Sequence, residues 1–157
     1  MRTLVLGLGN ELLADDAVGL LAARALKREF DGHIDVIESS ESGLALLDHL
    51  VGYDRAIILD AIRTGRCPAG EILEYTVDDL RHVAAPSPHY AGIPELLELA
   101  RRLGLDFPAD LRIIAIEAEN LHEIGGQPSV QVTAGVEKAV ALASGYLRED
   151  IREARHA

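Results

Sequence analysis

The sequence predicts a single α/β domain, a three-layer α/β/α structure around a mostly parallel five-stranded sheet. Short β-rich apolar runs, at residues 3–8, 55–62 and 111–118, have the length and composition of strands that are covered on both faces. Amphipathic helical patterns separate these runs, and strands that alternate with helices form layered sheets. The 157 residues, 48% of them hydrophobic, contain no internal repeat or linker, so we expect residues 1–157 to share one core.

The predicted elements follow one another in a regular order. We expect strands at 3–8, 34–39, 55–62, 70–77 and 111–118, and helices at about 16–30, 44–51, 94–103 and 129–148. Residues 78–90, rich in proline and histidine, are expected to form a loop, and residues 151–157 a charged tail after the last helix. The strand at 70–77 follows a link of only about seven residues, whereas a parallel crossover needs a dozen or more. This strand is therefore predicted to run antiparallel, at an edge of the sheet.

The charge balance and the cysteine content exclude several classes of function. Fifteen basic and 26 acidic residues give a net charge of −11, which disfavours nucleic acid as a partner. A single cysteine, Cys67, excludes a disulfide framework and a multi-cysteine metal site, and we interpret it as an incidental loop thiol. No apolar run approaches the length of a membrane span, and the first one is too short for a signal peptide. We therefore expect a cytoplasmic protein that binds no membrane, and we expect it to be a monomer.

Acidic side chains follow the first and the third predicted strands. Asp15 and Asp16 come after the strand at 3–8, and Asp60 falls near the end of the strand at 55–62. In such sheets ligands bind at the carboxyl ends of the strands, where the direction of winding reverses. A strand order of 2-1-3 would bring Asp16 and Asp60 into one crevice there. An aspartate that closes an apolar run is costly unless it is paired, solvated or functional, which favours a role for Asp60.

Local structure alone could explain most of the other candidate residues. Asp15 is most simply the N-cap of the first helix, and Asp16 would then hold the first helical position, where the helix dipole favours a carboxylate. His89, in Ser87-Pro88-His89, would by itself be an ordinary loop histidine. The other histidines keep that interpretation: His33, His49, His82, His122 and His156. His122-Glu123 begins like a zinc-peptidase helix, but Gly126 stands where the second histidine belongs.

The glycine turn after the first strand also suggests a dinucleotide site. Gly7 and Gly9 match the start of a G-x-G-x-x-G turn, which lets a pyrophosphate approach the backbone at a helix N-terminus. Leu12 stands where the third glycine should be, and Asp15 and Asp16 would repel a phosphate. A nucleotide-binding oxidoreductase is therefore the disfavoured alternative.

The same stretch carries a second resemblance. Residues 7–19 read G-x-G-N-x-L-x-x-D-D-x-x-G, which resembles the hydrogenase maturation endopeptidases, and the similarity extends to residues 126–130. These enzymes remove the C-terminal extension of the large subunit of nickel–iron hydrogenases. The resemblance implies a phosphorylase/hydrolase-like fold, a single peptidase domain and a large-subunit precursor as partner. It further implies that nickel, delivered with the substrate, is the recognition element, and that no organic cofactor takes part.

By this resemblance, the metal ligands and catalytic residues fall on Asp16, Asp60 and His89. Two carboxylates and one imidazole suit a borderline divalent ion such as nickel or zinc, and three protein ligands leave positions open for a substrate. We expect the three side-chain tips to lie within roughly 4–7 Å of one another, as ligands of one ion do. The first ligand is often glutamate in the family and is aspartate here. A non-enzymatic, nickel-sensing assembly factor remains a second alternative.

Overall fold

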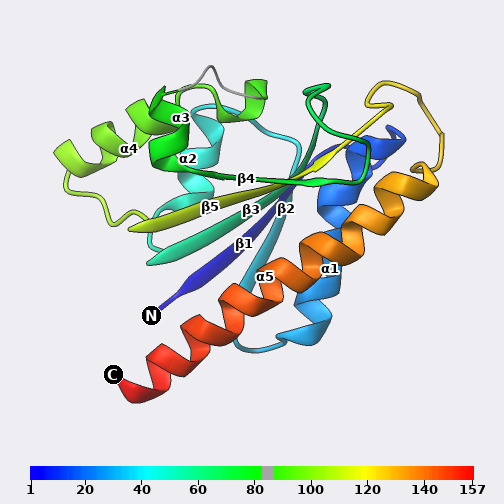
Figure 1. Ribbon diagram of the computed structural model, residues 1–157. Helices are drawn as coiled ribbons and strands as arrows, with labels where there is room; N and C mark the ends of the chain where they lie inside the picture. The colour runs from blue at the N-terminus through cyan, green and yellow to red at the C-terminus, as the bar shows by residue number, and fades with distance from the viewer. Residues whose placement is uncertain (83–86) are drawn as a thin grey trace.

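The structure is a computed structural model that describes residues 1–82 and 87–157. Its centre is a five-stranded sheet in the order β2-β1-β3-β5-β4 (Figure 1). The strands are β1 (Thr3–Leu8), β2 (Asp35–Ser39), β3 (Arg55–Ile62), β4 (Ile72–Thr76) and β5 (Asp110–Glu117). Strand β1 pairs in parallel with β2 and β3, β3 pairs in parallel with β5, and β4 runs antiparallel to β5 at one edge. The predicted α/β class, the 2-1-3 order and the antiparallel fourth strand are all confirmed.

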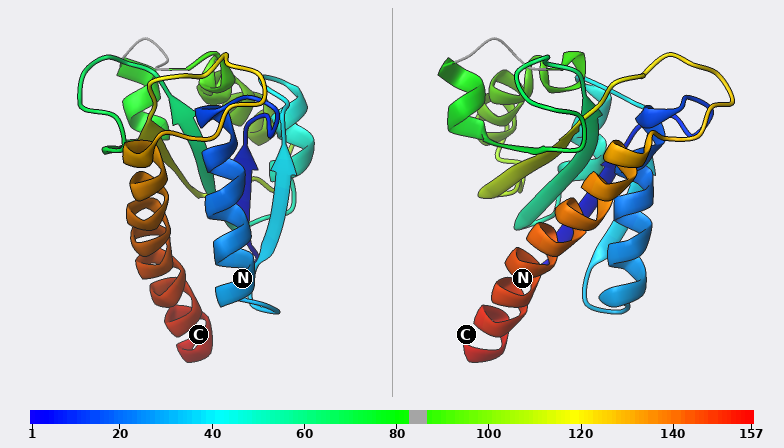
Figure 2. Two further views of the ribbon diagram at one scale, coloured as in Figure 1. Left: turned by 90° about the vertical axis from the view of Figure 1, so that its right-hand side faces the viewer. Right: turned by 45° about the vertical axis from the view of Figure 1, so that its right-hand side comes forward.

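Helices cover both faces of the sheet. They are α1 (Val18–Glu29), α2 (Ala45–Leu50), α3 (Val77–His82), α4 (Ile93–Arg102) and α5 (Val130–His156). Helices α1 and α5 lie side by side on one face, and the three shorter helices cover the other (Figures 1 and 2). Each face has its own apolar core, with Leu26 and Leu147 in one and Leu46 and Ile93 in the other. All six residues of β1 are buried between these cores, and all but Thr3 are apolar, as expected of a strand that is covered on both faces.

Two glycines of the motif after β1 permit a close approach between backbones. A Cβ atom on Gly19, near the start of α1, would lie 2.6 Å from the carbonyl oxygen of Leu59 and collide with that of Leu8. Gly9 has a φ of 150°, and a Cβ there would collide with the carbonyl oxygen of Asp16. The helix start is therefore pressed against the carboxyl ends of β1 and β3, which places Asp16 beside the end of β3.

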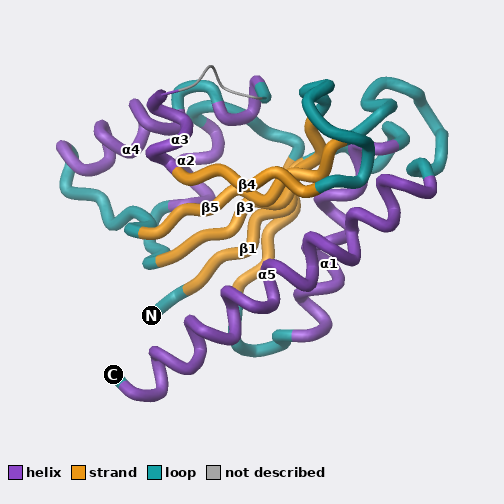
Figure 3. The backbone as a smooth tube through the Cα atoms, viewed as in Figure 1, coloured by secondary structure: helices purple, strands orange, loops and turns teal. Residues whose placement is uncertain are grey.

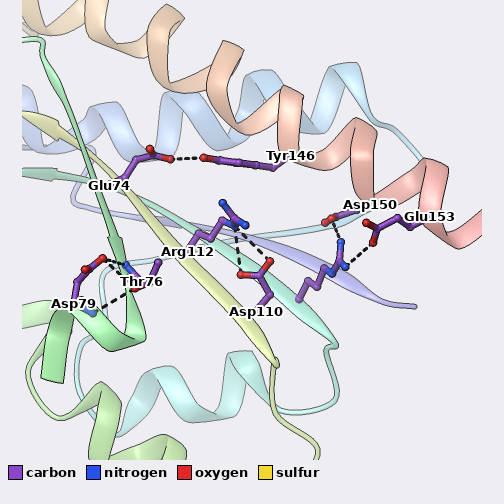
Figure 4. Close-up of polar contacts among 9 residues, drawn as sticks. Glu74, Thr76, Asp79, Asp110, Arg112, Tyr146, Asp150 and Glu153 are labelled. Carbon is purple, nitrogen blue, oxygen red and sulfur yellow. Dashed lines mark hydrogen bonds and ion pairs between the residues drawn. The ribbon is translucent and has the colours of Figure 1, made fainter.

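The predicted loop at 78–90 is wrong at both ends. Helix α3 begins at Val77, and a 3-10 helix, η2 (Pro88–Tyr90), closes the segment; residues 83–86 lie outside the described part. Thr76 and Asp79 explain α3, because the Asp79 carboxylate accepts from the backbone N–H and hydroxyl of Thr76 while the Thr76 hydroxyl accepts from the Asp79 N–H (Figure 4). This reciprocal cap is readable as T-x-x-D in the sequence.

The predicted charged tail at 151–157 is also wrong, because α5 continues to His156. Arg55, the first residue of β3, forms ion pairs with Asp150 and Glu153 of the last turns of α5, both labelled in Figure 4. Ile151 packs against the core on the same side. The end of α5 is thus held against the amino ends of the strands, far from the residues that follow β1 and β3.

Candidate functional site

The connections after β1, β3 and β5 gather at one end of the sheet (Figure 3). A cavity opens among them. Its volume is about 450 Å³. Side chains from these three connections, from the end of β3, from η2 and from Ser87 just before it line the cavity: Leu13, Asp16, Ala61, Ile62, Arg63, Ser87, His89, Leu121 and His122. The cavity therefore lies at the carboxyl ends of the parallel strands, as the strand order predicts.

Asp60 lies beneath this cavity, on β3, with none of its surface exposed to solvent. Its Oδ2 atom accepts a hydrogen bond from the hydroxyl of Tyr90 at 3.0 Å and lies 2.8 Å from Nδ1 of His89, and Oδ1 accepts from the backbone N–H of Ala61. Tyr90 is itself 1% exposed. Burial raises the pKa of Asp60, against the opposing effects of His89 and Tyr90. The buried carboxylate is therefore fully hydrogen-bonded, as its position inside a strand requires.

His89 is presented to the cavity by η2 and by Asp60. Since the ionised carboxylate can only accept, the imidazole donates its Nδ1–H to Asp60, which leaves Nε2 as the ring nitrogen that can meet a ligand. This hydrogen bond raises the pKa of His89, and burial opposes it. A carboxylate that binds one ring nitrogen and directs the other outward is a common support for metal-binding histidines.

Asp16 faces the same cavity from the 3-10 helix η1 (Asp15–Ala17), which joins β1 to α1. Its Oδ2 atom accepts from the backbone N–H of Asn10 at 2.9 Å. Burial raises the pKa of Asp16, the charge of Asp60 raises it further, and His89 and His122 lower it. Asp16 and His89 thus line one cavity, and Asp60 lies directly behind His89.

The predicted role of Asp15 as an N-cap is wrong. Neither η1 nor α1 has a side-chain cap, and Asp15, 1% exposed, instead accepts hydrogen bonds from the backbone N–H groups of Glu119, Asn120 and Ser129. The segment 118–129 is thereby tied to the turn after β1. A partner more than a hundred residues away leaves no trace in local spacing, so the sequence could not identify it.

The donor chemistry fits a divalent ion, but the arrangement differs from the expected one. Asp60 and His89 are in direct hydrogen-bond contact at 2.8 Å, closer than the expected spacing of two ligands of one ion. Within residues 1–82 and 87–157, no group of three or more His, Cys, Asp and Glu side chains is arranged to hold a metal. Asp16 and the imidazole of His89 meet the cavity directly, whereas Asp60 occupies the position of a carboxylate that orients a histidine.

Sequence reasoning missed three residues of the site. Tyr90 shares the Asp60 carboxylate, and His122 and Arg63 line the cavity. His122 was interpreted as an ordinary histidine because its H-E motif is incomplete, and its place depends on the connection after β5 being tied beside η1. The position of Tyr90 directly after His89 is the only local signal among the three.

Comparisons with known proteins agree with this fold. A family model described as hydrogenase maturation protease matches residues 20–145. The hydrogenase 2 maturation protease of Escherichia coli (strain K12) is 31% identical over 159 residues, covering 98% of this chain and 95% of that protein. The hydrogenase expression/formation protein HupD of Thiocapsa roseopersicina is 31% identical over 151 residues, covering 93% of this chain and 67% of that protein.

Solved structures show the same relationship. The hydrogenase maturating endopeptidase HybD from Escherichia coli matches with a TM-score of 0.80 at 29% identity, over 96% of this chain and 94% of that one. The NiFe hydrogenase maturation protease HybD from Thermococcus kodakarensis matches with a TM-score of 0.75 at 32% identity, over 94% of this chain and 99% of that one. The chain therefore belongs to the hydrogenase maturation proteases, a family of peptidases.

Proposed function

We propose that this peptidase removes the C-terminal extension of a nickel–iron hydrogenase large-subunit precursor after nickel has been inserted, with the nickel as recognition element. The observation that carries the proposal is the cavity at the carboxyl ends of β1 and β3, where Asp16 and the Asp60–His89 pair converge. Family membership supplies the reaction class, and the names of the relatives point to hydrogenases as the system it serves.

In this proposal the three predicted residues act together on nickel that the precursor already carries. Asp16 and Nε2 of His89 are placed to meet it through the cavity, and the buried Asp60 acts through His89, which it orients. Peptide cleavage needs a polarised carbonyl group and an activated water molecule. The ion of the precursor or a carboxylate of the site would supply these functions, with the scissile bond held beside them.

The same proposal places the reaction in the cytoplasm and has the protein act as a monomer, with neither nucleic acid nor a membrane as partner. The net charge of −11 disfavours contact with nucleic acid. None of the helices in the described ranges combines the length and the apolar character needed to cross a membrane.

The proposal is tested by incubating the protein with nickel-loaded precursor and measuring the mass of the product. The wild-type protein should release one C-terminal peptide. Asp60→Asn keeps the size of the side chain but removes its charge, so folding should survive, as checked by circular dichroism, while processing falls below about 1% of the wild-type rate. Cys67→Ala, in the β3–β4 connection, is the matched control and should change neither. Wild-type processing by Asp60→Asn would contradict the site, and binding of precursor without shortening would indicate an assembly factor instead.

A further inference from the structure

Arg63 stands on the wall of the cavity, directly after β3 ends at Ile62. Its side chain is exposed, and it is the one lysine or arginine among the lining residues of the described chain. The remainder of that lining is apolar or acidic, or carries an imidazole or the hydroxyl group of Ser87. A permanent positive charge is therefore placed where a substrate peptide would lie.

The guanidinium group of Arg63 has no anionic partner among the described residues, although acidic residues outnumber basic ones by 26 to 15. Seven other arginines do form ion pairs: Arg2, Arg24, Arg55, Arg101, Arg102, Arg112 and Arg148. The neighbouring charges that shift the pKa of Asp16 belong to Asp60, His89 and His122. Arg63 is thus not the counter-ion of the catalytic carboxylates, and its charge remains available to a ligand.

A buried carboxylate that the proposed mechanism does not use fixes the backbone beside Arg63. Glu117, 2% exposed at the end of β5, accepts hydrogen bonds from the backbone N–H groups of Thr64 and Gly65, at 2.9 and 2.7 Å, and from the Thr64 hydroxyl at 2.9 Å. Glu117 also pairs in register with Ile62 across the sheet. The backbone of Arg63 is therefore held between the end of a strand and a clamped turn, while its side chain is free to turn toward a ligand.

We propose that Arg63 binds a carboxylate side chain of the precursor close to the scissile bond, with Glu117 as the positioning residue; this inference rests on the proposed function. A guanidinium group pairs with a carboxylate through two parallel hydrogen bonds, which fixes both distance and orientation. An acidic group entering a cavity that contains Asp16 would otherwise meet like charge. Arg63 thus sets which precursor, and which register of its chain, enters the site.

The test compares steady-state cleavage of nickel-loaded precursor by the wild type, Arg63→Gln, Arg63→Lys and Arg66→Gln. Arg66 lies in the same connection and is also exposed but does not line the cavity, so it is the matched control. Arg63→Gln should raise KM about tenfold and change kcat less than about twofold, because a ground-state ion pair is lost. Arg63→Lys should raise KM less than Arg63→Gln does, because lysine keeps the positive charge but lacks the planar guanidinium group that donates two parallel hydrogen bonds. Arg66→Gln should behave as the wild type.

A second arm identifies the partner on the precursor. Each acidic residue near the cleavage point is changed to its amide, and KM is measured with the wild type and with Arg63→Gln. One of these precursors should show the raised KM with the wild type and no further rise with Arg63→Gln, as expected of two residues that act on each other. Glu117→Gln should raise KM in the same direction with the intact precursor and should have less effect on the precursor that lacks the partner.

Three results would overturn the assignment while wild-type cleavage is intact. These are an unchanged KM in Arg63→Gln, a fall of kcat at constant KM, which would place Arg63 on the reacting atoms, and an equal effect of Arg66→Gln, which would indicate general surface charge. A wild-type protein that leaves the precursor whole would instead overturn the proposed function, and this inference with it. The two failures are therefore distinguishable.

Discussion

One oxygen atom, Oδ2 of Asp60, connects the residues around the cavity at the carboxyl ends of the strands. It receives hydrogen bonds from both His89 and Tyr90, and its charge acts on Asp16. Because Asp60 is inaccessible to solvent, these neighbours take the place of water around it. A substitution of Asp60 should therefore change the orientation and the proton affinity of His89 before it affects any other residue of the site.

Removing the Asp60 charge should lower the pKa of His89. In the wild type, the hydrogen bond to Asp60 raises this pKa above the usual 6.5, so Asp60→Asn should bring it down. A raised folded-state pKa stabilises the protein below the unfolded value, and that contribution is lost as pH rises through the folded value. NMR titration of the His89 imidazole ring in the wild type and in Asp60→Asn measures the shift. An unchanged His89 titration in the variant would contradict the pairing.

The role of a single residue was predictable where the neighbouring sequence shows that its burial would cost free energy. Asp60 interrupts an apolar strand, so a special role was expected of it, and the structure shows it buried and fully hydrogen-bonded. Asp15 and Asp16 are adjacent and chemically identical, yet Asp15 faces the 118–129 segment and Asp16 faces the cavity. That division depends on contacts across the fold, so the N-cap prediction for Asp15 was wrong.

At the scale of the elements, Asp15 connects the turn after β1 to the segment 118–129, which forms one wall of the cavity. Asp15→Ala should leave the N–H groups of Glu119, Asn120 and Ser129 without their acceptor and lower the free energy of unfolding by about 2–4 kcal/mol. Ser129→Ala removes only the cap of α5, whose hydroxyl accepts from Val132, and should cost about 1 kcal/mol. Urea unfolding of both variants measures the difference, and equal losses would show that Asp15 has no such role.

The far end of α5 offers a second test at this scale. Asp150→Ala should lower the free energy of unfolding by about 1–3 kcal/mol, because it leaves the half-buried Arg55 guanidinium without its buried partner. Glu153→Ala removes a mostly exposed partner of the same arginine and should change stability by no more than about 0.5 kcal/mol. Thermal unfolding of the pair distinguishes a structural end of α5 from a frayed one, for which both changes would be neutral.

The elements themselves were predicted to within a few residues where apolar periodicity marks them. The exceptions are α3 and the end of α5, and both depend on polar contacts. A charged run such as 151–157 is typical of a solvated tail, and the partner that orders the last turns, Arg55, lies 95 residues before Asp150. Helix α3, by contrast, carries its own cap at Thr76 and Asp79, so closer reading of the sequence could have found it.

For the molecule as a whole, chain order and link lengths were enough to predict the sheet. The short link before β4, which spans nine residues (63–71) in the structure, required an antiparallel edge strand, and the structure places β4 there. That topology in turn brings three connections, distant in sequence, to one end of the sheet (Figure 3). The residues that complete the cavity, His122 and Arg63 among them, follow from this convergence, and no motif in the sequence marks them.

The arrangement of the site also bears on the source of the metal. The predicted ligands include one nitrogen and no thiolate, and Asp60 and His89 are hydrogen-bonded to each other. The affinity of the protein alone for an ion should therefore be modest, and the ion should arrive with the substrate. Protein dialysed against a chelator is expected to cleave nickel-loaded precursor at the wild-type rate and to leave nickel-free precursor whole, because without the ion Asp16 and His89 have no group to bind beside the scissile bond.

The assay incubates both precursor forms with chelator-treated protein and follows the gel shift of the shortened product. Chelator-treated protein that first receives nickel and is then desalted is the control, and it should behave like the untreated protein on both forms. Cleavage of nickel-free precursor, or a need to restore metal to the protein itself, would favour a conventional metallopeptidase with a resident ion. In that case Asp60 and His89 would have to separate in the resting protein, and the NMR titration of His89 would show metal binding before any precursor is added.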